Sequence, residues 1–280
     1  MSRPAKAAGA PAYVCGHAPR EFDRLALQSR LYEAVTRRLL VRAGVDAGQH
    51  VVDLGCGGGD VSRLAADVVG STGLVIGVDR APDAVTAARA RTAHLPQVRI
   101  VGGELDQWRP DAPVDAVIGR FVLMHQRDPI AVLARVRTWL RPGGVVAFVE
   151  SDTGGLQPGR HSRPHSPTYH RIVEVWQQTL RVARAHVAMG TGLVDAFVAA
   201  GLDDPSVEID TYTSGDPASP IFPFAIESLR ALLPMASAHG ITAPAEAELD
   251  AIDAALRAEV AAADGVLSAP PAYAVWARVD

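Results

Sequence analysis

Four glycines follow a short apolar run in the segment VVDLGCGGGD, residues 51–60, and this spacing indicates a ligand-binding turn. The apolar run is typical of a parallel strand that is covered on both faces. Glycine has no Cβ, so Gly55 and Gly57 can adopt a positive φ and let a ligand approach the backbone closely. The strand, the glycine turn and the helix expected after it together predict a site for a nucleotide-like ligand.

The details of this segment favour a zwitterionic or cationic ligand over a diphosphate. A dinucleotide-binding fingerprint needs glycines in the order G-x-G-x-x-G, and Asp60 stands where the third glycine would fall. Asp53, at the end of the strand, would repel a pyrophosphate but attract an ammonium group. A nucleotide-dependent oxidoreductase is the alternative that shares this fold class, and these two carboxylates argue against it.

The segment resembles motif I of the class I S-adenosylmethionine-dependent methyltransferases, and further motifs follow in the same order over residues 46–150. The runs LVIGVD, VRIVGGEL, VDAVIGRFVLMH and WLRPGGVVAFVE resemble the second to fifth strands of that family with their neighbouring loops. The resemblance implies that S-adenosyl-L-methionine is the cofactor. It also implies methyl transfer to an O, N or C atom of a small molecule, similar to ubiquinone- and menaquinone-biosynthesis and antibiotic-tailoring enzymes.

The resemblance further implies a set of cofactor-binding residues. Asp79, at the tip of the second predicted strand, would accept both hydroxyls of the ribose. Glu104 and the backbone of Leu105 would lie at the adenine edge, with Asp106 as a rival to Glu104. The full predicted set is Tyr13, Gln28, Asp53, Gly55, Cys56, Gly57, Asp79, Arg80, Glu104, Leu105 and Arg120.

The chemistry follows from this cofactor. A sulfonium methyl group is already electrophilic, so the enzyme mainly aligns a nucleophile and excludes water. A hydroxyl acceptor would also need a general base. The candidate bases are His125 after the fourth strand and His161 and His165 in the loop after the fifth, with Glu150 and Asp152 as alternatives. The two loop histidines are not spaced along a helix face, and no metal site is predicted.

The segment from Ser151 to Pro167 is rich in Gly, Pro, Ser and His, which predicts a loop at the carboxyl edge of the sheet. Tyr13 and Gln28 resemble residues of a cofactor-covering lid. We expect this loop and the N-terminal helix to close together over the acceptor. The side chain of Arg120 is expected either to pair with Glu150 or to anchor an acidic substrate.

Strands and helices alternate from Val51 to Glu150, which predicts a doubly wound, mostly parallel α/β sheet. The resemblance implies seven strands, the last two antiparallel, with helical cap elements. Met124, Trp176 and Phe222 are interpreted as core residues. Outside the alternating region, helices are expected over 21–43, 168–188, 193–200 and most of 224–263, and strands over 207–212 and 273–279.

The predicted organisation is one structural domain with four parts. These are a cap or lid helix over 1–45, a cofactor-binding core over 46–150, a substrate-side loop and helices over 151–205, and the last two strands with a helical insertion over 206–280. With 280 residues, 48% of them hydrophobic, the chain can bury a large core.

Charge and composition limit the kinds of partner that we expect. The net charge of −4 gives no electrostatic reason to expect a nucleic-acid ligand. The first residues lack a signal-peptide pattern, and no uninterrupted apolar run approaches the ~18 residues that a membrane span needs. Two cysteines fit a reducing compartment. We expect a cytoplasmic enzyme with a small-molecule acceptor and no nucleic-acid or membrane partner. A homodimer and a non-catalytic S-adenosylmethionine-binding protein remain open alternatives.

Overall fold

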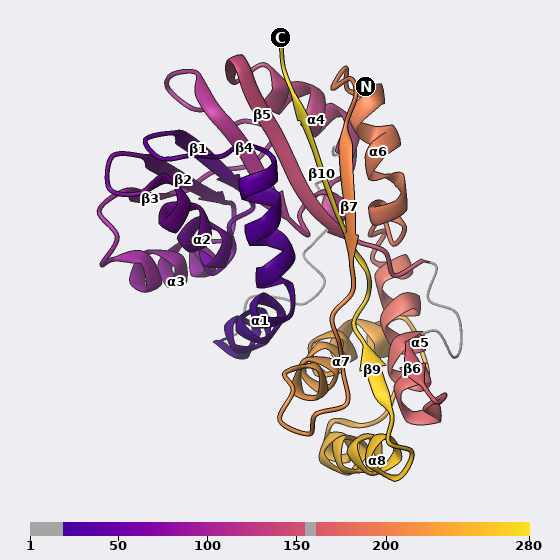
Figure 1. Cartoon of the computed structure of the whole chain (residues 1–280). Coiled ribbons are helices and arrows are strands. Elements are labelled where there is room, and N and C mark those ends of the chain that lie inside the picture. Colours follow the sequence, from indigo (N-terminus) through magenta and orange to yellow (C-terminus); the bar gives the residue numbers. More distant parts are fainter. Residues whose placement is uncertain (1–18, 155–160) are drawn as a thin grey trace, which may run out of the picture.

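A seven-stranded sheet forms the centre of the molecule (Figure 1). The computed structural model describes residues 19–154 and 161–280. The strands are β1 (His50–Leu54), β2 (Leu74–Asp79), β3 (Val98–Gly102), β4 (Val114–Arg120), β5 (Leu140–Ser151), β7 (Ser206–Asp210) and β10 (Ala272–Arg278). Their order is β3-β2-β1-β4-β5-β10-β7; the first five are parallel and β10 is antiparallel to both neighbours. The predicted doubly wound, mostly parallel sheet is confirmed.

Helices cover both faces of this sheet. The helices that pack against it are α1 (Pro19–Arg42), α2 (Asp60–Val69), α3 (Pro82–Thr92), α4 (Pro129–Arg137) and α6 (Met189–Ala199). The helices α5 (Pro167–Val182), α7 (Ile221–Ala238) and α8 (Leu249–Ala262) pack against one another, and two short 3-10 turns are η1 (Leu123–His125) and η2 (Glu246–Glu248). Val51 packs with α1 and α2 on one face, whereas Val52 packs with α4 and α6 on the other. Because both valines are fully buried, β1 has the continuous apolar character of a strand covered on both sides.

A second, three-stranded antiparallel sheet lies beside α5, α7 and α8 in the lower part of Figure 1. Its strands are β6 (Ser162–Arg163), β9 (Val266–Ser268) and β8 (Thr213–Ser214), in that order. The sequence predicts only a loop around β6. The loop contains this strand because Ser162 pairs with Leu267, a partner more than a hundred residues away that no local pattern announces.

The predicted helices after β5 differ slightly in extent. α5 ends at Val182 instead of continuing to residue 188, since Arg184 adopts a φ of 59° that a helix cannot accommodate. α7 and α8 fill the predicted helical insertion between β7 and β10. Among the described residues, α7 is the one helix long and apolar enough to cross a membrane, yet half of it is buried, against α1, α5 and α8, as in a core helix.

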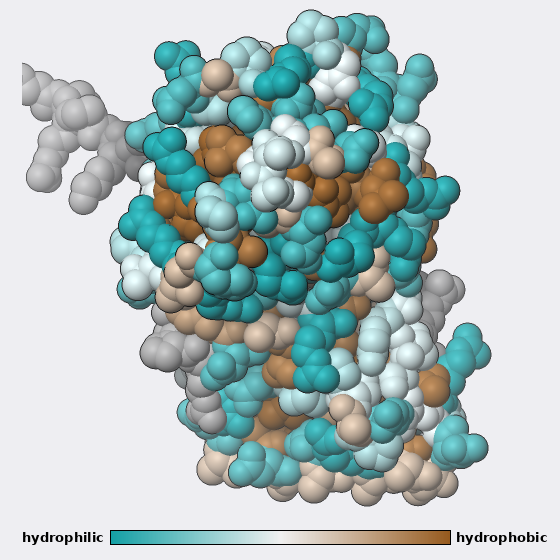
Figure 2. All heavy atoms as spheres, turned by 60° about the vertical axis from the view of Figure 1, so that its left-hand side comes forward, coloured by the Kyte–Doolittle hydropathy of each residue, from teal (hydrophilic) through white to brown (hydrophobic). Residues whose placement is uncertain are grey.

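The face shown in Figure 2 mixes hydrophilic residues with small hydrophobic patches. Many large apolar side chains lie inside the molecule, as the buried rings of Phe148 and Trp176 illustrate.

Candidate active site

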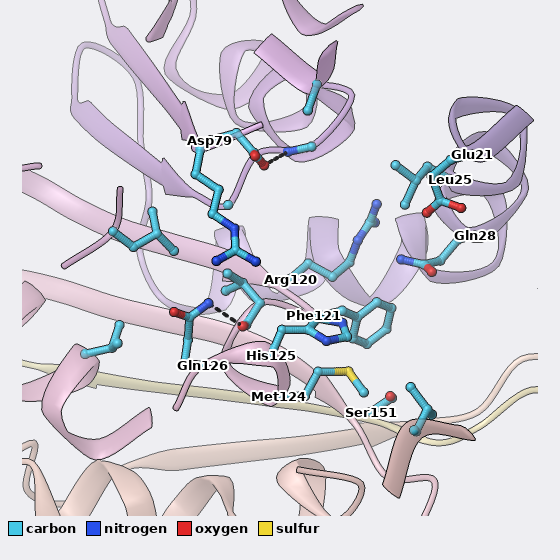
Figure 3. A pocket seen from close by; sticks show the side chains of 18 of the residues that line it. Glu21, Leu25, Gln28, Asp79, Arg120, Phe121, Met124, His125, Gln126 and Ser151 are labelled. Carbon is cyan, nitrogen blue, oxygen red and sulfur yellow. Dashed lines mark hydrogen bonds between the residues drawn. The ribbon is translucent and has the colours of Figure 1, made fainter. Parts of the chain in front are cut away.

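A cavity of about 660 Å³ opens at the carboxyl ends of β1, β2 and β4, within the ~300–1,000 Å³ typical of ligand pockets. α1 contributes one helix face to its wall, and η1 and α4 contribute another part (Figure 3). The lining side chains from α1 are Glu21, Phe22, Arg24, Leu25, Gln28 and Tyr32. In an open α/β sheet this edge is where ligands bind, so the cavity is the candidate site.

The glycine turn and Asp79 form one wall of this cavity. Gly55 and Gly57 have φ values of 66° and 51°, which confirms the predicted positive φ. The N–H of Gly57 donates to one oxygen of Asp79 at 2.9 Å, and the N–H of Ala81 donates to the other at 2.9 Å. The carboxylate is therefore held at the tip of β2, and Figure 3 shows it across the cavity from the α1 residues.

Asp53 in β1 and Cys56 within the glycine turn are buried and do not line the cavity. Asp53 is 1% exposed and accepts a hydrogen bond of 2.6 Å from the Ser62 hydroxyl. Burial raises the pKa of Asp53 to about 7, although the hydrogen bond from Ser62 lowers it in part. Burial also raises the pKa of the free Cys56 thiol. Neither side chain lines the cavity, so their contact with the cofactor stays a prediction.

Two predicted elements of the adenine edge lie together in the cavity wall. Glu104, Leu105 and the rival Asp106 all line it. The guanidinium of Arg135 donates to the backbone oxygens of Leu105 at 2.9 Å and Trp108 at 2.8 Å, which holds this turn in place. Arg80 lines the same region.

Arg120 also lines the cavity, but its partner differs from the expected one. Its guanidinium donates to the Thr36 hydroxyl of α1 at 3.2 Å, whereas the described partners of Glu150 are backbone N–H groups. Burial lowers the pKa of Arg120, while the charges of Asp60 and Asp53 raise it. Arg120 thus links the end of β4 to α1.

Glu150 performs a structural task instead. Its carboxylate accepts the backbone N–H groups of Val122, Leu123 and Met124 at 2.9, 2.7 and 3.2 Å. Burial raises the pKa of Glu150 to about 8, and these three hydrogen bonds lower it in part. Glu150 does not line the cavity. It holds η1 in position, and η1 carries His125.

His125 lines the cavity, whereas the other two candidate histidines do not. Burial, with the charges of Arg24 and Arg80, lowers the pKa of His125 to about 4. The imidazole is therefore neutral near pH 7 and can accept a proton.

The structure places His161 and His165 at the second sheet, away from the cavity. The His161 carbonyl accepts the N–H of Ser268 at 2.7 Å. His165 lies in a separate hollow of about 150 Å³, with its ring 5.5 Å from that of His170. The prediction that this loop brings a base to the acceptor is not supported, because β6 fixes residues 162–163 to β9. Asp152 accepts the Thr191 hydroxyl at 2.5 Å and does not line the cavity either.

The predicted lid is described only in part. Gln28 lines the cavity, and its side-chain oxygen accepts from Arg24 at 2.9 Å; Arg24 also pairs with Glu21. Tyr13 lies outside the described residues. Within 19–154 and 161–280, no group of three His, Cys, Asp or Glu side chains could hold a metal ion.

Sequence reasoning missed the apolar part of the cavity. Met124 and Trp176 are buried as predicted, but both also line the cavity. Phe222 is a core residue, packed against Arg257 at 4.7 Å. The missed lining residues from β5, α5 and α7 and their neighbours are Ser151, Thr153, Leu180, Phe224, Ser228, Leu232 and Pro270. Their helical spacing, as in Phe224, Ser228 and Leu232, is a signal that a core helix gives equally well.

Comparisons with known proteins agree with this geometry. Residues 51–144 match the family described as "Methyltransferase domain". Trans-aconitate 2-methyltransferase of Azoarcus sp. (strain BH72) is 32% identical over 149 residues, 53% of this chain and 54% of that protein. A 2-phytyl-1,4-naphtoquinone methyltransferase of Synechococcus elongatus is 31% identical over 145 residues, 50% of this chain and 58% of that protein. The chain spans about half the length of these curated relatives.

Solved structures share the fold. The structure of a putative methyltransferase from Bacillus halodurans C-125 matches with a TM-score of 0.54 at 16% identity. The match covers 87% of this chain and 97% of the other chain. The structure of the cyclase SpnF matches with a TM-score of 0.51 at 20% identity, and this match covers 88% of this chain and 80% of the cyclase chain. Residues 51–144 are therefore similar to a methyltransferase domain, and the fold is shared with a putative methyltransferase and with a cyclase.

Proposed function

We propose that the chain transfers the methyl group of S-adenosyl-L-methionine to an O, N or C atom of a small molecule. The observation that carries this proposal is a single cavity bounded by the glycine turn and the Asp79 carboxylate at one end and by apolar side chains at the other. The first end has the groups that a ribose and a zwitterionic amino acid need, and the second has room for an acceptor.

The residues present fit this cofactor. The Gly57 backbone lies open to the cavity, since a Cβ there would meet nothing closer than Leu25 at 3.8 Å. The Asp79 carboxylate keeps acceptor capacity for ribose hydroxyls beyond its two backbone hydrogen bonds. Glu104 and the backbone of Leu105 would face the adenine, and Gln28 and Arg120, which also line the cavity, would contact the remaining part of the cofactor.

The same geometry argues against a dinucleotide. Diphosphates bind at the N-terminus of the helix that follows the glycine turn. Here that helix, α2, begins with Asp60, whose carboxylate pairs with Arg91 at 2.6 Å. A carboxylate at this position would repel a diphosphate, which supports a methyltransferase over a nucleotide-dependent oxidoreductase.

When bound, the cofactor would supply an electrophilic methyl group, so the protein's own part is to position the acceptor and exclude water. For a hydroxyl acceptor, the neutral His125 is the candidate proton acceptor. Neither His161 nor His165 is proposed for this role.

We also propose a cytoplasmic location and an acceptor that is neither nucleic acid nor membrane lipid. The net charge of −4 supports an acceptor other than nucleic acid.

The proposal is tested by incubating the purified chain with S-adenosylmethionine and a panel of metabolites. The expected result is a product heavier by one CH₂, detected by mass spectrometry, together with S-adenosylhomocysteine. The Asp79→Ala variant should lose both products, whereas Asp83→Ala, an exposed carboxylate on α3, should keep them. Tight cofactor binding with no product from any acceptor would favour the non-catalytic alternative.

A further inference from the structure

The seven-stranded sheet ends at β7, on the side opposite β3 (Figure 1). Within residues 19–154 and 161–280, β7 forms its hydrogen-bonded ladder with β10 alone. The backbone N–H and C=O groups on its outer side are therefore available to another strand. The sequence of β7, SVEID, contains neither lysine nor proline, which commonly prevent an edge strand from pairing with another chain.

One face of β7 is apolar and exposed. Val207 pairs with Val275 of β10, which belongs to the same hydrophobic cluster as α6. Because paired residues share a face and alternate residues do too, Val207 and Ile209 both lie on the α6 side. α6 packs over β5 and β10, and Val207 and Ile209 remain 48% and 58% exposed. Of the six exposed large hydrophobic residues in the described part of the chain, four lie on four different helices, whereas these two share one short strand.

The other face of β7 carries a charge-balanced cluster. Arg38 of α1 donates to Glu208 at 2.7 Å and also pairs with Asp210. Arg42 donates to Glu208 at 2.8 Å. Two carboxylates therefore meet two guanidinium groups in each chain. The side chains of Arg38 and Arg42 are 44% and 61% exposed, so both can also contact a carboxylate on a neighbouring molecule.

We infer that β7 is an interface between two copies of this chain, which join edge to edge as antiparallel strands about a two-fold axis. An axis through Glu208 pairs all five residues of the strand and sets Val207 of one copy opposite Ile209 of the other. The apolar faces of the two strands are then continuous, and the two sheets form one sheet. The inference is independent of the cofactor and the acceptor, because β7 contributes no residue to the cavity.

The charges of the strand favour a second copy as the partner. The axis places the two Glu208 carboxylates opposite each other, and like charges in that position are destabilising when they are uncompensated. Here Arg38 and Arg42 of each copy lie beside them, so four carboxylates meet four guanidinium groups across the interface. The edge is therefore complementary to itself in its backbone groups, its apolar side chains and its charges.

Sedimentation velocity of the purified full chain measures this association. We expect a reversible monomer–dimer equilibrium with a Kd of about 1–100 μM, because a five-residue strand buries a limited area. Ile209→Lys should raise this Kd at least tenfold, since the dimer would bury the added charge. Ile130→Lys is the matched control, because Ile130 is 42% exposed on α4, and it should leave the Kd unchanged.

Oxidative cross-linking tests the position of the axis. Glu208→Cys should form a disulfide between two chains on treatment with diamide, because the two copies of residue 208 lie directly opposite, with Cβ atoms about 4.5–5.5 Å apart. Ser206→Cys should cross-link much less, because the same register places it opposite Asp210. The wild-type chain gives the background from Cys15 and Cys56. Circular dichroism and the melting temperature verify that each variant is folded.

A monomer at every concentration up to about 200 μM, well above the expected Kd, would overturn the inference. A dimer that is equally stable in folded Ile209→Lys, or that is lost equally in Ile130→Lys, would also overturn it. Equal cross-linking of Glu208→Cys and Ser206→Cys would contradict the proposed axis. None of these outcomes bears on the methyl donor, so failure here is distinguishable from failure of the proposed function.

Discussion

The two ends of the cavity are built in different ways. The cofactor end consists of turns at the carboxyl ends of parallel strands, where backbone N–H groups and the Asp79 carboxylate form the wall. The acceptor end consists of side chains on the faces of α1, α5 and α7. The first is a property of one contiguous stretch of chain, whereas the second exists only after distant helices pack together.

This difference explains where similarity to other proteins is found. Residues 51–144, which supply the glycine turn and Asp79, match the methyltransferase domain. Trp176 and Ser228 lie outside that match. A separately built acceptor end would let one fold serve several reactions. The SpnF cyclase shares the fold.

The largest effect is expected from Gly55→Val. Its φ is 66°, and a Cβ would come within 2.4 Å of a Val122 methyl group. Backbone strain and overpacking together should lower the free energy of unfolding by about 3 kcal/mol or more. Gly143→Val is the matched control, because Gly143 has a φ of 78° but nothing within 4 Å. Urea unfolding of both variants separates the clash from the strain; equal losses would show that Gly55 has the space for a side chain.

Asp79→Ala should affect only the cofactor end. Hydrogen bonds to a charged group contribute about 1.5–3 kcal/mol each, so loss of the ribose contacts should raise the Kd of S-adenosylhomocysteine at least tenfold, which is about 1.4 kcal/mol. Calorimetry measures this Kd. An unchanged Kd for S-adenosylhomocysteine would remove Asp79 from the cofactor site.

His125→Gln should lower turnover of a hydroxyl acceptor by about 100-fold, with little change in cofactor affinity. Steady-state kinetics with the acceptor found by mass spectrometry measures this effect. If His125→Gln turns over at the wild-type rate, catalysis depends on positioning of the acceptor without a general base, because neither Glu150 nor Asp152 lines the cavity.

His125 should also affect stability at acidic pH. Its pKa in the folded chain is about 4, below the ~6.5 of an unfolded histidine. The unfolded chain therefore takes up a proton that the folded chain does not, and stability falls as the pH decreases from about 6.5 to about 4. The full pKa difference corresponds to a loss of about 3 kcal/mol in the free energy of unfolding. The expected loss is smaller, because the His125 side chain is partly exposed. Urea titrations across this pH range should show a smaller decrease for His125→Gln.

Leu180→Ala gives the smallest predicted effect and confines it to the acceptor end. Loss of apolar contact should weaken binding of the acceptor found by mass spectrometry by about fivefold, or about 1 kcal/mol, and leave the Kd of S-adenosylhomocysteine unchanged. Val182→Ala, an exposed position on the same helix, is the control. Equal weakening of both ligands would contradict the separation of the two ends.

Sequence was informative wherever one local pattern determines the position of a residue. The apolar run before Asp79 puts its carboxylate at a strand tip, and the glycines of the turn adopt the expected φ. Trp176 could not be assigned to the cavity in this way, because a helix face that borders a cavity has the same spacing as one that borders the core.

The misplacement of the loop histidines has a similar cause. Their position depends on the pairing of Ser162 with Leu267, a contact between segments far apart in the chain. The role of Glu150 was also hidden, since only the folded structure brings the backbone N–H groups of η1 to its carboxylate.

The most direct test of the central claim is calorimetry of the wild-type chain with S-adenosylmethionine and with NAD under the same conditions. The geometry predicts that S-adenosylmethionine binds, that S-adenosylhomocysteine displaces it, and that NAD does not compete, because Asp60 lies at the N-terminus of α2. Tighter binding of NAD than of S-adenosylmethionine would contradict the assignment of the cavity to a methyl donor.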